Sequence, residues 1–103
     1  MANGYFSATA AGTDSGATAT QAANATQAFV VKNISGHVDA DAVITIESPA
    51  STILWESKID VSVEGFSFDF NPCIPLTTRN TAILGKLSAS SADCQVTISG
   101  EII

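Results

Sequence analysis

Apolar and polar residues alternate along several short segments of the chain, which is the pattern of strands with one buried face. The clearest case is residues 39–47, where Ala40, Ala42, Ile44 and Ile46 share one parity and mostly polar residues share the other. A 3.6-residue period is found nowhere along the chain, so no helix of useful length is predicted.

The densest aromatic segment is residues 66–70, where three phenylalanines alternate with Ser67 and Asp69. Large aromatic side chains dominate the burial of small domains, so this strand is predicted to form the heaviest part of the core. Pro72 and Pro75 bracket the loop expected after it, and a further strand is expected to open near residue 80.

Residues 52–63 alternate as well, with mostly apolar odd-numbered positions. Ile53 and Trp55 are therefore predicted to face the core, and a break near Ser57 would divide the segment into two short strands. The alternative for Trp55 is an exposed ring that stacks on a ligand such as a sugar.

Seven or eight short strands with turn signals between them favour a sandwich or a barrel. The expected strands cover residues 17–22, 29–34, 39–47, 52–63, 66–70, 81–87 and 94–103, with a turn at 35–37. Trp55 precedes both cysteines, which is not the immunoglobulin order. We therefore predict an all-β, jelly-roll-like β-sandwich of seven to eight short antiparallel strands.

The first residues differ from the rest by their Ala, Thr, Ser and Gly content. We interpret 1–16 as an N-terminal arm and 17–103 as the β-sandwich domain, with an edge strand near 17–22. A disordered tail is the alternative, but Tyr5 and Phe6 favour an arm that packs on a neighbouring subunit. Deleting 1–16 would then weaken attachment to that neighbour and leave the β-fold intact.

The composition is apolar for a small domain, with 46% hydrophobic and 14% charged residues and a mean hydropathy of +0.29. No apolar run approaches the roughly 20 residues of a membrane-spanning helix, so burial against other subunits is the interpretation we favour. The net charge is −6, with only four basic residues, which argues against binding nucleic acid. The N-terminus lacks the features of a secretory signal, so synthesis in a cytoplasm is expected.

Cys73 and Cys94 are the two cysteines of the chain. Cys94 falls on the apolar parity of its strand, so a buried structural thiol is the first interpretation. A Cys73–Cys94 disulfide is the alternative, and a loop of about 20 residues would give it a stabilisation of roughly 3 kcal/mol.

The single histidine, His37, has no sequence neighbours that suggest a metal or catalytic role. Asp39, Asp41 and Glu47 share a strand face that cannot wrap a calcium ion, so we interpret it as solvated. No cofactor and no enzymatic activity are predicted.

The residues expected to contact other subunits lie in the arm and in the segment after the aromatic strand. Arg79 could pair with an acidic residue of a neighbour. The full set of interface candidates is Tyr5, Phe6, Pro72, Ile74, Pro75, Arg79 and Asn80.

The order of several short motifs resembles a group of small jelly-roll virion proteins of phages. These motifs are Ala-Thr-Ala-Thr-Gln-Ala-Ala (17–23) before the apolar 28–31, Thr-Ile-Leu-Trp-Glu (52–56), Pro-Cys-Ile-Pro-Leu (72–76), Thr-Arg-Asn-Thr-Ala (78–82) and Gln-Val-Thr-Ile-Ser-Gly (95–100). The chain differs from the family in having Thr-Thr-Arg where a glycine is usual. The resemblance implies a structural component of the virion, often trimeric, on the capsid or in the tail, with no active site.

From these observations we expect a capsid decoration (cement) protein, made in the host cytoplasm. It would form a homotrimer on the virion and clamp adjacent copies of the major capsid protein. The alternative is a tail or fibre-associated module that binds a host-surface receptor through Trp55 and the 72–79 loop. A jelly-roll enzyme would need a cluster of histidines, and the chain has one.

Overall fold

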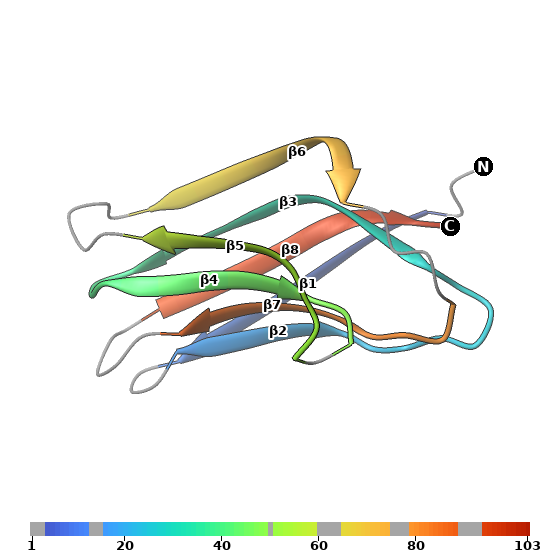
Figure 1. Cartoon of the computed structure of the whole chain (residues 1–103), viewed down its shortest axis with the longest axis horizontal. Helices are drawn as coiled ribbons and strands as arrows, with labels where there is room; N and C mark the ends of the chain where they lie inside the picture. The colour runs from blue at the N-terminus through green and yellow to red at the C-terminus, as the bar shows by residue number, and fades with distance from the viewer. Residues whose placement is uncertain (1–3, 13–15, 50, 60–64, 75–78, 89–93) are drawn as a thin grey trace.

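Two antiparallel β-sheets pack face to face in the computed structural model of the chain (Figure 1). The structure describes residues 4–12, 16–49, 51–59, 65–74, 79–88 and 94–103, with the backbone alone for 71–74. All named elements in these ranges are strands, which confirms the all-β prediction. None of the described elements is a helix long and apolar enough to cross a membrane.

Each sheet contains four strands, in the orders β1-β8-β3-β6 and β2-β7-β4-β5. The strands are β1 (Gly4–Gly12), β2 (Ala17–Gln21), β3 (Phe29–Val38), β4 (Ala42–Glu47), β5 (Ile53–Ile59), β6 (Phe66–Ile74), β7 (Ile83–Ser88) and β8 (Cys94–Ile102). We call them the β1-β8-β3-β6 sheet and the β2-β7-β4-β5 sheet.

The pairing of the strands is that of a jelly roll. β1 pairs with β8, β2 with β7, β3 with β6 and β4 with β5, as in one long antiparallel ribbon folded over on itself. The additional pairs β3–β8 and β4–β7 join these ribbons into two sheets. The predicted jelly-roll sandwich is therefore confirmed, with eight strands.

The core fills the space between the sheets with aliphatic side chains from alternate strand positions. Its largest fully buried members are Phe29, Val31, Ile34, Ile44, Ile46, Ile83, Leu87, Val96 and Ile98. Gly85 of β7 also faces inward, where a Cβ atom would overlap Cγ2 of Ile98 and lie 3.2 Å from Cδ1 of Ile34. Glycine therefore allows the two sheets to approach closely at this point.

Aromatic rings close the sandwich where the edge strands β5 and β6 meet. The ring centroid of Trp55 lies 5.0 Å from that of Phe68 and 5.1 Å from that of Phe70, in tilted and edge-to-face arrangements. These distances are those of favourable aromatic pairs. Trp55 thus packs against the core, as the first of the two interpretations predicted.

The N-terminal arm is a correction to the sequence prediction. Residues 4–12 form β1, which pairs with β8 along its whole length, from Gly4 opposite Ile102 to Gly12 opposite Cys94. Phe6 is buried within the same chain and packs edge to face on Phe29. The small residues of this segment form a strand because β8 supplies the hydrogen-bond partners and the core accepts Phe6. The edge strand predicted near 17–22 is confirmed as β2.

Two predicted loops belong to strands instead. β3 continues through 35–37, where Gly36 lets the backbone approach Gln95 of β8. β6 continues through Pro72 to Ile74. Proline is tolerated there because β6 is an edge strand with one unpaired side.

The predicted inward position of Ile53 is wrong because β5 contains a bulge. Trp55 lies opposite Ile46, but Ile53 lies opposite Glu47, so Leu54 is the extra residue between them. One extra residue reverses the faces of the strand, and Ile53 is 54% exposed. The predicted break near Ser57 does not occur, and Val61 and Val63 lie outside the described residues.

Candidate interaction surface

Short polar side chains from all four strands cover the outer face of the β1-β8-β3-β6 sheet. Buried residues alternate with these positions, which fixes their outward direction. We call this surface the hydroxyl face and define it by Ser7, Thr9, Asn33, Ser35, Ser67, Asp69, Thr97 and Ser99.

The strand register places these residues in two rows across the sheet. Thr9, Thr97, Ser35 and Ser67 form one row, and Ser7, Ser99, Asn33 and Asp69 form the other. The rows follow from the shared pairing of β8 and β3 with their neighbours, since directly opposite residues point to the same side of a sheet.

Hydrogen bonds link neighbouring side chains within this surface. Thr9 Oγ1 and Thr97 Oγ1 are 2.8 Å apart. Asn33 Nδ2 donates to Ser67 Oγ at 3.0 Å and to Asp69 Oδ1 at 2.6 Å. These contacts hold the side chains in place, so the surface is ordered before it meets any partner.

One end of the hydroxyl face carries an ion pair and an exposed aromatic ring. Lys32 Nζ donates to Glu101 Oε1 at 3.0 Å. Tyr5 lies opposite Glu101 and is 79% exposed, the highest value among the large hydrophobic residues described. An exposed tyrosine next to a polar surface is a common anchor of protein interfaces.

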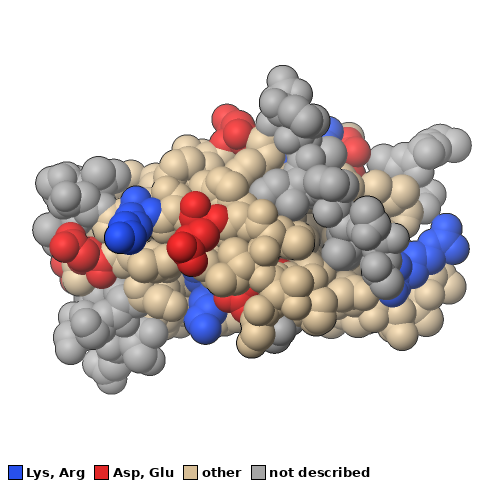
Figure 2. All heavy atoms as spheres, viewed as in Figure 1, with Lys and Arg blue, Asp and Glu red and all other residues tan. Residues whose placement is uncertain are grey.

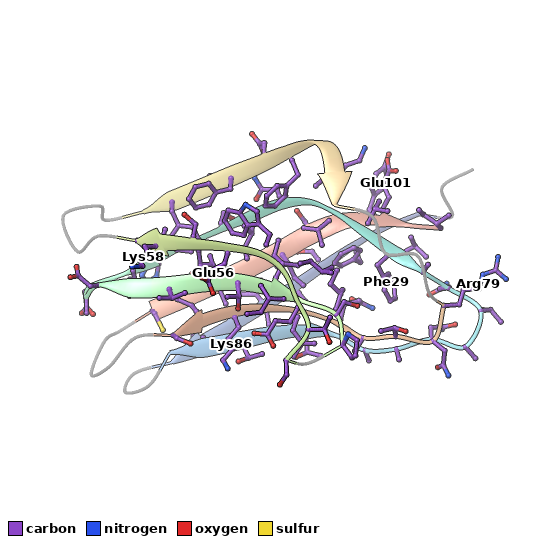
Figure 3. All side chains as sticks on the ribbon, in the orientation of Figure 1. Phe29, Glu56, Lys58, Arg79, Lys86 and Glu101 are labelled. Carbon is purple, nitrogen blue, oxygen red and sulfur yellow. The ribbon has the colours of Figure 1, made fainter. Side chains whose placement is uncertain are left out.

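The outer face of the β2-β7-β4-β5 sheet differs because it carries long charged side chains. Thr45 of β4 lies between Lys86 of β7 and Glu56 of β5, and Lys58 follows on β5 (Figure 3). On the side of the molecule seen in Figure 2, charged side chains form separate spots on a mostly uncharged surface.

Glu47 is buried on this second face, with its carboxylate fully engaged. Its Oε2 accepts from Thr45 Oγ1 at 3.0 Å, and its Oε1 accepts from the backbone N–H of Ser51 at 2.7 Å. Ser48 beside it donates through Oγ to the carbonyl of Ala82 at 2.8 Å. These contacts anchor the connection between β4 and β5, so Glu47 is a structural carboxylate.

The predicted interface residues of the first strand separate into two environments. Tyr5 is exposed, so it stays a candidate for contact with a partner. Phe6 is 6% exposed, so its ring belongs to the core of its own chain and does not project toward a neighbouring subunit as the arm interpretation expected. The difference follows from the alternation of β1, which was not recognised as a strand.

The remaining interface candidates lie near the end of β6 and before β7. The structure gives only the backbone of Pro72 and Ile74, with Ile74 opposite Val31, and Pro75 lies outside the described residues. Arg79 and Asn80 are both exposed.

Asn80 has a structural role in addition to its exposure. It adopts a left-handed conformation, with φ of 60°. Its N–H donates to the carbonyls of Asn24, at 3.0 Å, and Gln27, at 3.4 Å. Asparagine tolerates this conformation better than most residues, so Asn80 joins the segment before β7 to the turn at 24–27.

The register rules out a Cys73–Cys94 disulfide. Cys94 lies opposite Val38, and Ile74, next to Cys73, lies opposite Val31 at the other end of β3. Seven residues of strand separate these positions by about 23 Å, whereas bonded cysteines have Cα atoms less than about 7 Å apart. Cys94 is buried, as its parity predicted, with Sγ 3.7 Å from the carbonyl oxygen of Gly12.

Comparisons with known proteins identify no family. No family model matches the chain, and no curated protein matches it. A solved structure described as "CBM4 structure and function" is similar at a TM-score of 0.32 and 13% identity, over 97% of this chain and 92% of that chain. A likeness at this level carries no argument about function.

The hydroxyl face was not predicted from the sequence, because each strand carries only two of its residues. Its signal is a pair of polar residues two positions apart in four segments: Ser7 and Thr9, Asn33 and Ser35, Ser67 and Asp69, Thr97 and Ser99. Only the sheet order brings the four pairs together. Within the described residues, no three His, Cys, Asp or Glu side chains gather where they could hold a metal ion.

Proposed function

We propose that this protein is a structural component of a phage virion, a capsid decoration (cement) protein that stabilises contacts between major capsid proteins. The observation that supports this proposal best is the hydroxyl face. The motif resemblance described above supplies the class of particle, and a jelly-roll sandwich supplies a rigid support for a flat binding surface.

The chemistry of the hydroxyl face suits a lasting contact with another protein surface. Serine and threonine side chains lose little rotamer freedom when they are covered, so docking has a small entropic cost. Each hydroxyl can both donate and accept a hydrogen bond, which helps it to match a polar partner. Tyr5 at the end of the face would provide an apolar anchor.

The size of this face favours attachment in several copies. Four strands about 4.8 Å apart, paired over about seven residues of about 3.3 Å each, give roughly 450 Å². A stable protein interface usually buries about 800 Å² on each partner. One copy would therefore bind weakly, and an oligomer, three copies by the resemblance, would hold the particle through avidity.

Lysine reactivity in intact virions tests the proposal, because the lysines mark opposite faces. Lys32 lies at the end of the hydroxyl face, and Lys58 and Lys86 lie on the other sheet. We expect Lys32 to be protected from acylation in virions and to cross-link to the major capsid protein, with Lys58 and Lys86 still reactive. Absence of the protein from virions, or protection of Lys58 and Lys86 alone, would refute the proposal.

A matched pair of substitutions tests the face itself. Ser99→Arg places a long charged side chain at the centre of the hydroxyl face, and Ser88→Arg makes the same change at an exposed position on the opposite face. We expect Ser99→Arg to weaken binding to purified capsids by about tenfold, equivalent to about 1.4 kcal/mol. Ser88→Arg should bind as the wild type does, and equal loss in both variants would contradict the assignment.

Receptor binding by a tail or fibre module receives less support from the geometry. That alternative needed an exposed Trp55, whereas this ring packs between Phe68 and Phe70. Cross-links from Lys32 to a tail protein would favour the alternative over capsid decoration.

A further inference from the structure

The two long sides of the sandwich differ in how their edge strands are protected. β5 and β6 form one side and β1 and β2 form the other (Figure 1). On the first side, β5 has a bulge at Leu54 and the charged Glu56 and Lys58, and β6 has Asp69 and Pro72. Bulges, charges and prolines are the usual means by which proteins prevent an edge strand from pairing with another chain.

The strand β1, from Gly4 to Gly12, has none of these protective features. β1 is nine residues long, contains no charged residue and no proline, and keeps an unbroken register with β8. It ends its sheet in the described part of the chain, so no described strand is hydrogen-bonded to its outer backbone edge. β2 beside it is also uncharged, and Asp14 is the one charged residue before Lys32.

We infer that β1 is a pairing edge for a second copy of this chain, which adds its own β1 antiparallel about a two-fold axis at Ala8. In this register the residue numbers of each pair, one from each copy, add up to 16. Even-numbered residues then meet even-numbered ones, so inward-facing residues pair with inward-facing residues and the two cores continue across the joint.

The same register places large side chains opposite small ones. Phe6 meets Ala10 of the second copy and Tyr5 meets Ala11, while Ala8 meets its own counterpart. Ala8 and Ala10 are partly buried against the core in one copy, and the pairing would cover them further. On the outer face, Ser7 meets Thr9, which matches the hydrogen-bonding rows of the hydroxyl face.

Charge favours a second copy at this edge over any other side of the molecule. Each chain has a net charge of −6, so two copies repel wherever acidic residues meet. Of the ten acidic residues, nine lie after residue 31, and β1 carries none. Pairing through β1 therefore joins the least charged parts of the two molecules.

The joined sheets would present one continuous eight-stranded hydroxyl face. Its area would be about twice the roughly 450 Å² of one copy, which reaches the size of a standard interface on one partner. The use of this enlarged face for attachment rests on the proposed function, whereas the pairing of the two β1 strands does not. Two-fold pairing predicts even numbers of chains, unlike the trimer implied by the resemblance.

Cysteine cross-linking of the full chain tests the register directly. Residues at the two-fold axis lie about 4.5–5.5 Å apart between their Cα atoms, a distance that a disulfide can span. Ala8→Cys should therefore form a covalent dimer under mild oxidation, far faster than Ser67→Cys at the distant β6 edge. Equal rates in the two variants would overturn the inference.

Solution mass tests the pairing without new cysteines. The wild type should show a mass of two 10.5 kDa chains by light scattering or sedimentation, and the Ser7→Lys/Thr9→Lys variant should be monomeric. Mixing that variant with Ser7→Glu/Thr9→Glu should restore dimers that contain one chain of each kind, which a misfolded protein would not do. A wild type that stays monomeric at every concentration, or that forms only trimers, would overturn the inference.

A control separates edge pairing from stacking of two hydroxyl faces. Ser35→Lys lies on the same outer face but on β3, inside the sheet. Edge pairing predicts that this variant remains dimeric, whereas face-to-face stacking predicts that it becomes monomeric. Loss of the dimer in Ser35→Lys would therefore refute the β1 register even if the wild type is a dimer. Retention of capsid binding by the monomeric Ser7→Lys/Thr9→Lys variant would contradict both the avidity consequence and the hydroxyl face as the capsid-binding surface, because both residues belong to that face. It would leave the β1 pairing itself intact.

Discussion

Gly85 provides a sharp test of how closely the two sheets pack. A methyl group at this position would overlap Cγ2 of Ile98 and lie 3.2 Å from Cδ1 of Ile34, and both isoleucines are fully buried. Overpacking of this kind costs about 1–3 kcal/mol. The loss of glycine's freedom in the unfolded chain returns about 0.4–1 kcal/mol. We therefore expect Gly85→Ala to lower the free energy of unfolding by about 1–2 kcal/mol.

Urea unfolding followed by the fluorescence of Trp55 measures this change, because the chain has a single tryptophan, packed between the sheets. Gly65→Ala is the matched control, since the one contact of its Cβ with the described residues is the carbonyl oxygen of Gly36 at an ordinary 3.6 Å. That variant should remain within about 0.5 kcal/mol of the wild type. A Gly85→Ala protein as stable as Gly65→Ala would refute the close approach of the sheets.

A double variant identifies the neighbour that causes the strain. Ile98→Ala removes the atom that the new methyl group would overlap, at a cost of about 2–5 kcal/mol on its own. In the Gly85→Ala/Ile98→Ala protein the methyl group enters the vacated space, so adding it should no longer destabilise the fold. Strictly additive effects would show that Ile98 is not the neighbour responsible.

Three further predictions concern other parts of the fold. Trp55→Ala should lower the free energy of unfolding by about 2–4 kcal/mol through loss of the contacts with Phe68 and Phe70, and Trp55→Phe should recover part of it, as measured by circular dichroism. Glu47→Leu should cost about 1–3 kcal/mol, because the hydroxyl of Thr45 and the N–H of Ser51 lose their acceptors, whereas the exposed Glu56→Leu should change little; similar losses in both variants would contradict the role of Glu47. Adding a reductant should leave the Tm unchanged, whereas a Cys73–Cys94 disulfide would give a loss of roughly 3 kcal/mol.

The parts of the fold that the sequence predicted well are those in which burial alone determines the pattern. The alternation of Ala42, Ile44 and Ile46 predicted β4, and that of Val96 and Ile98 predicted β8, because one face of each strand is fully buried. The jelly-roll class followed from the number and spacing of such segments. Strand order was not readable, since it depends on contacts between residues far apart in the chain.

The errors in the predicted strands occurred where a local feature hides the face to which each residue points or weakens the apolar–polar alternation. The bulge at Leu54 reverses the parity of Ile53 without any glycine to mark it. In β1, alanines occupy the inward positions at 8 and 10, so hydrophobic periodicity is weak and Phe6 is the only large buried side chain. An edge strand needs less apolar area than a central one, which is why composition suggested an arm.

The change from arm to edge strand also changes what a truncation can test. Under the arm hypothesis, removing residues 1–16 separates attachment from folding. In the sandwich, the same deletion removes Phe6 from its contact with Phe29 and leaves β8 as the new edge of its sheet. β8 carries Val96 and Ile98, both fully buried, so its exposure would destabilise the core and create an apolar edge open to aggregation. Loss of particle attachment after this truncation would therefore report on folding. Substitutions at exposed positions such as Ser7 and Thr9 can instead change the surface without changing the stability of the fold.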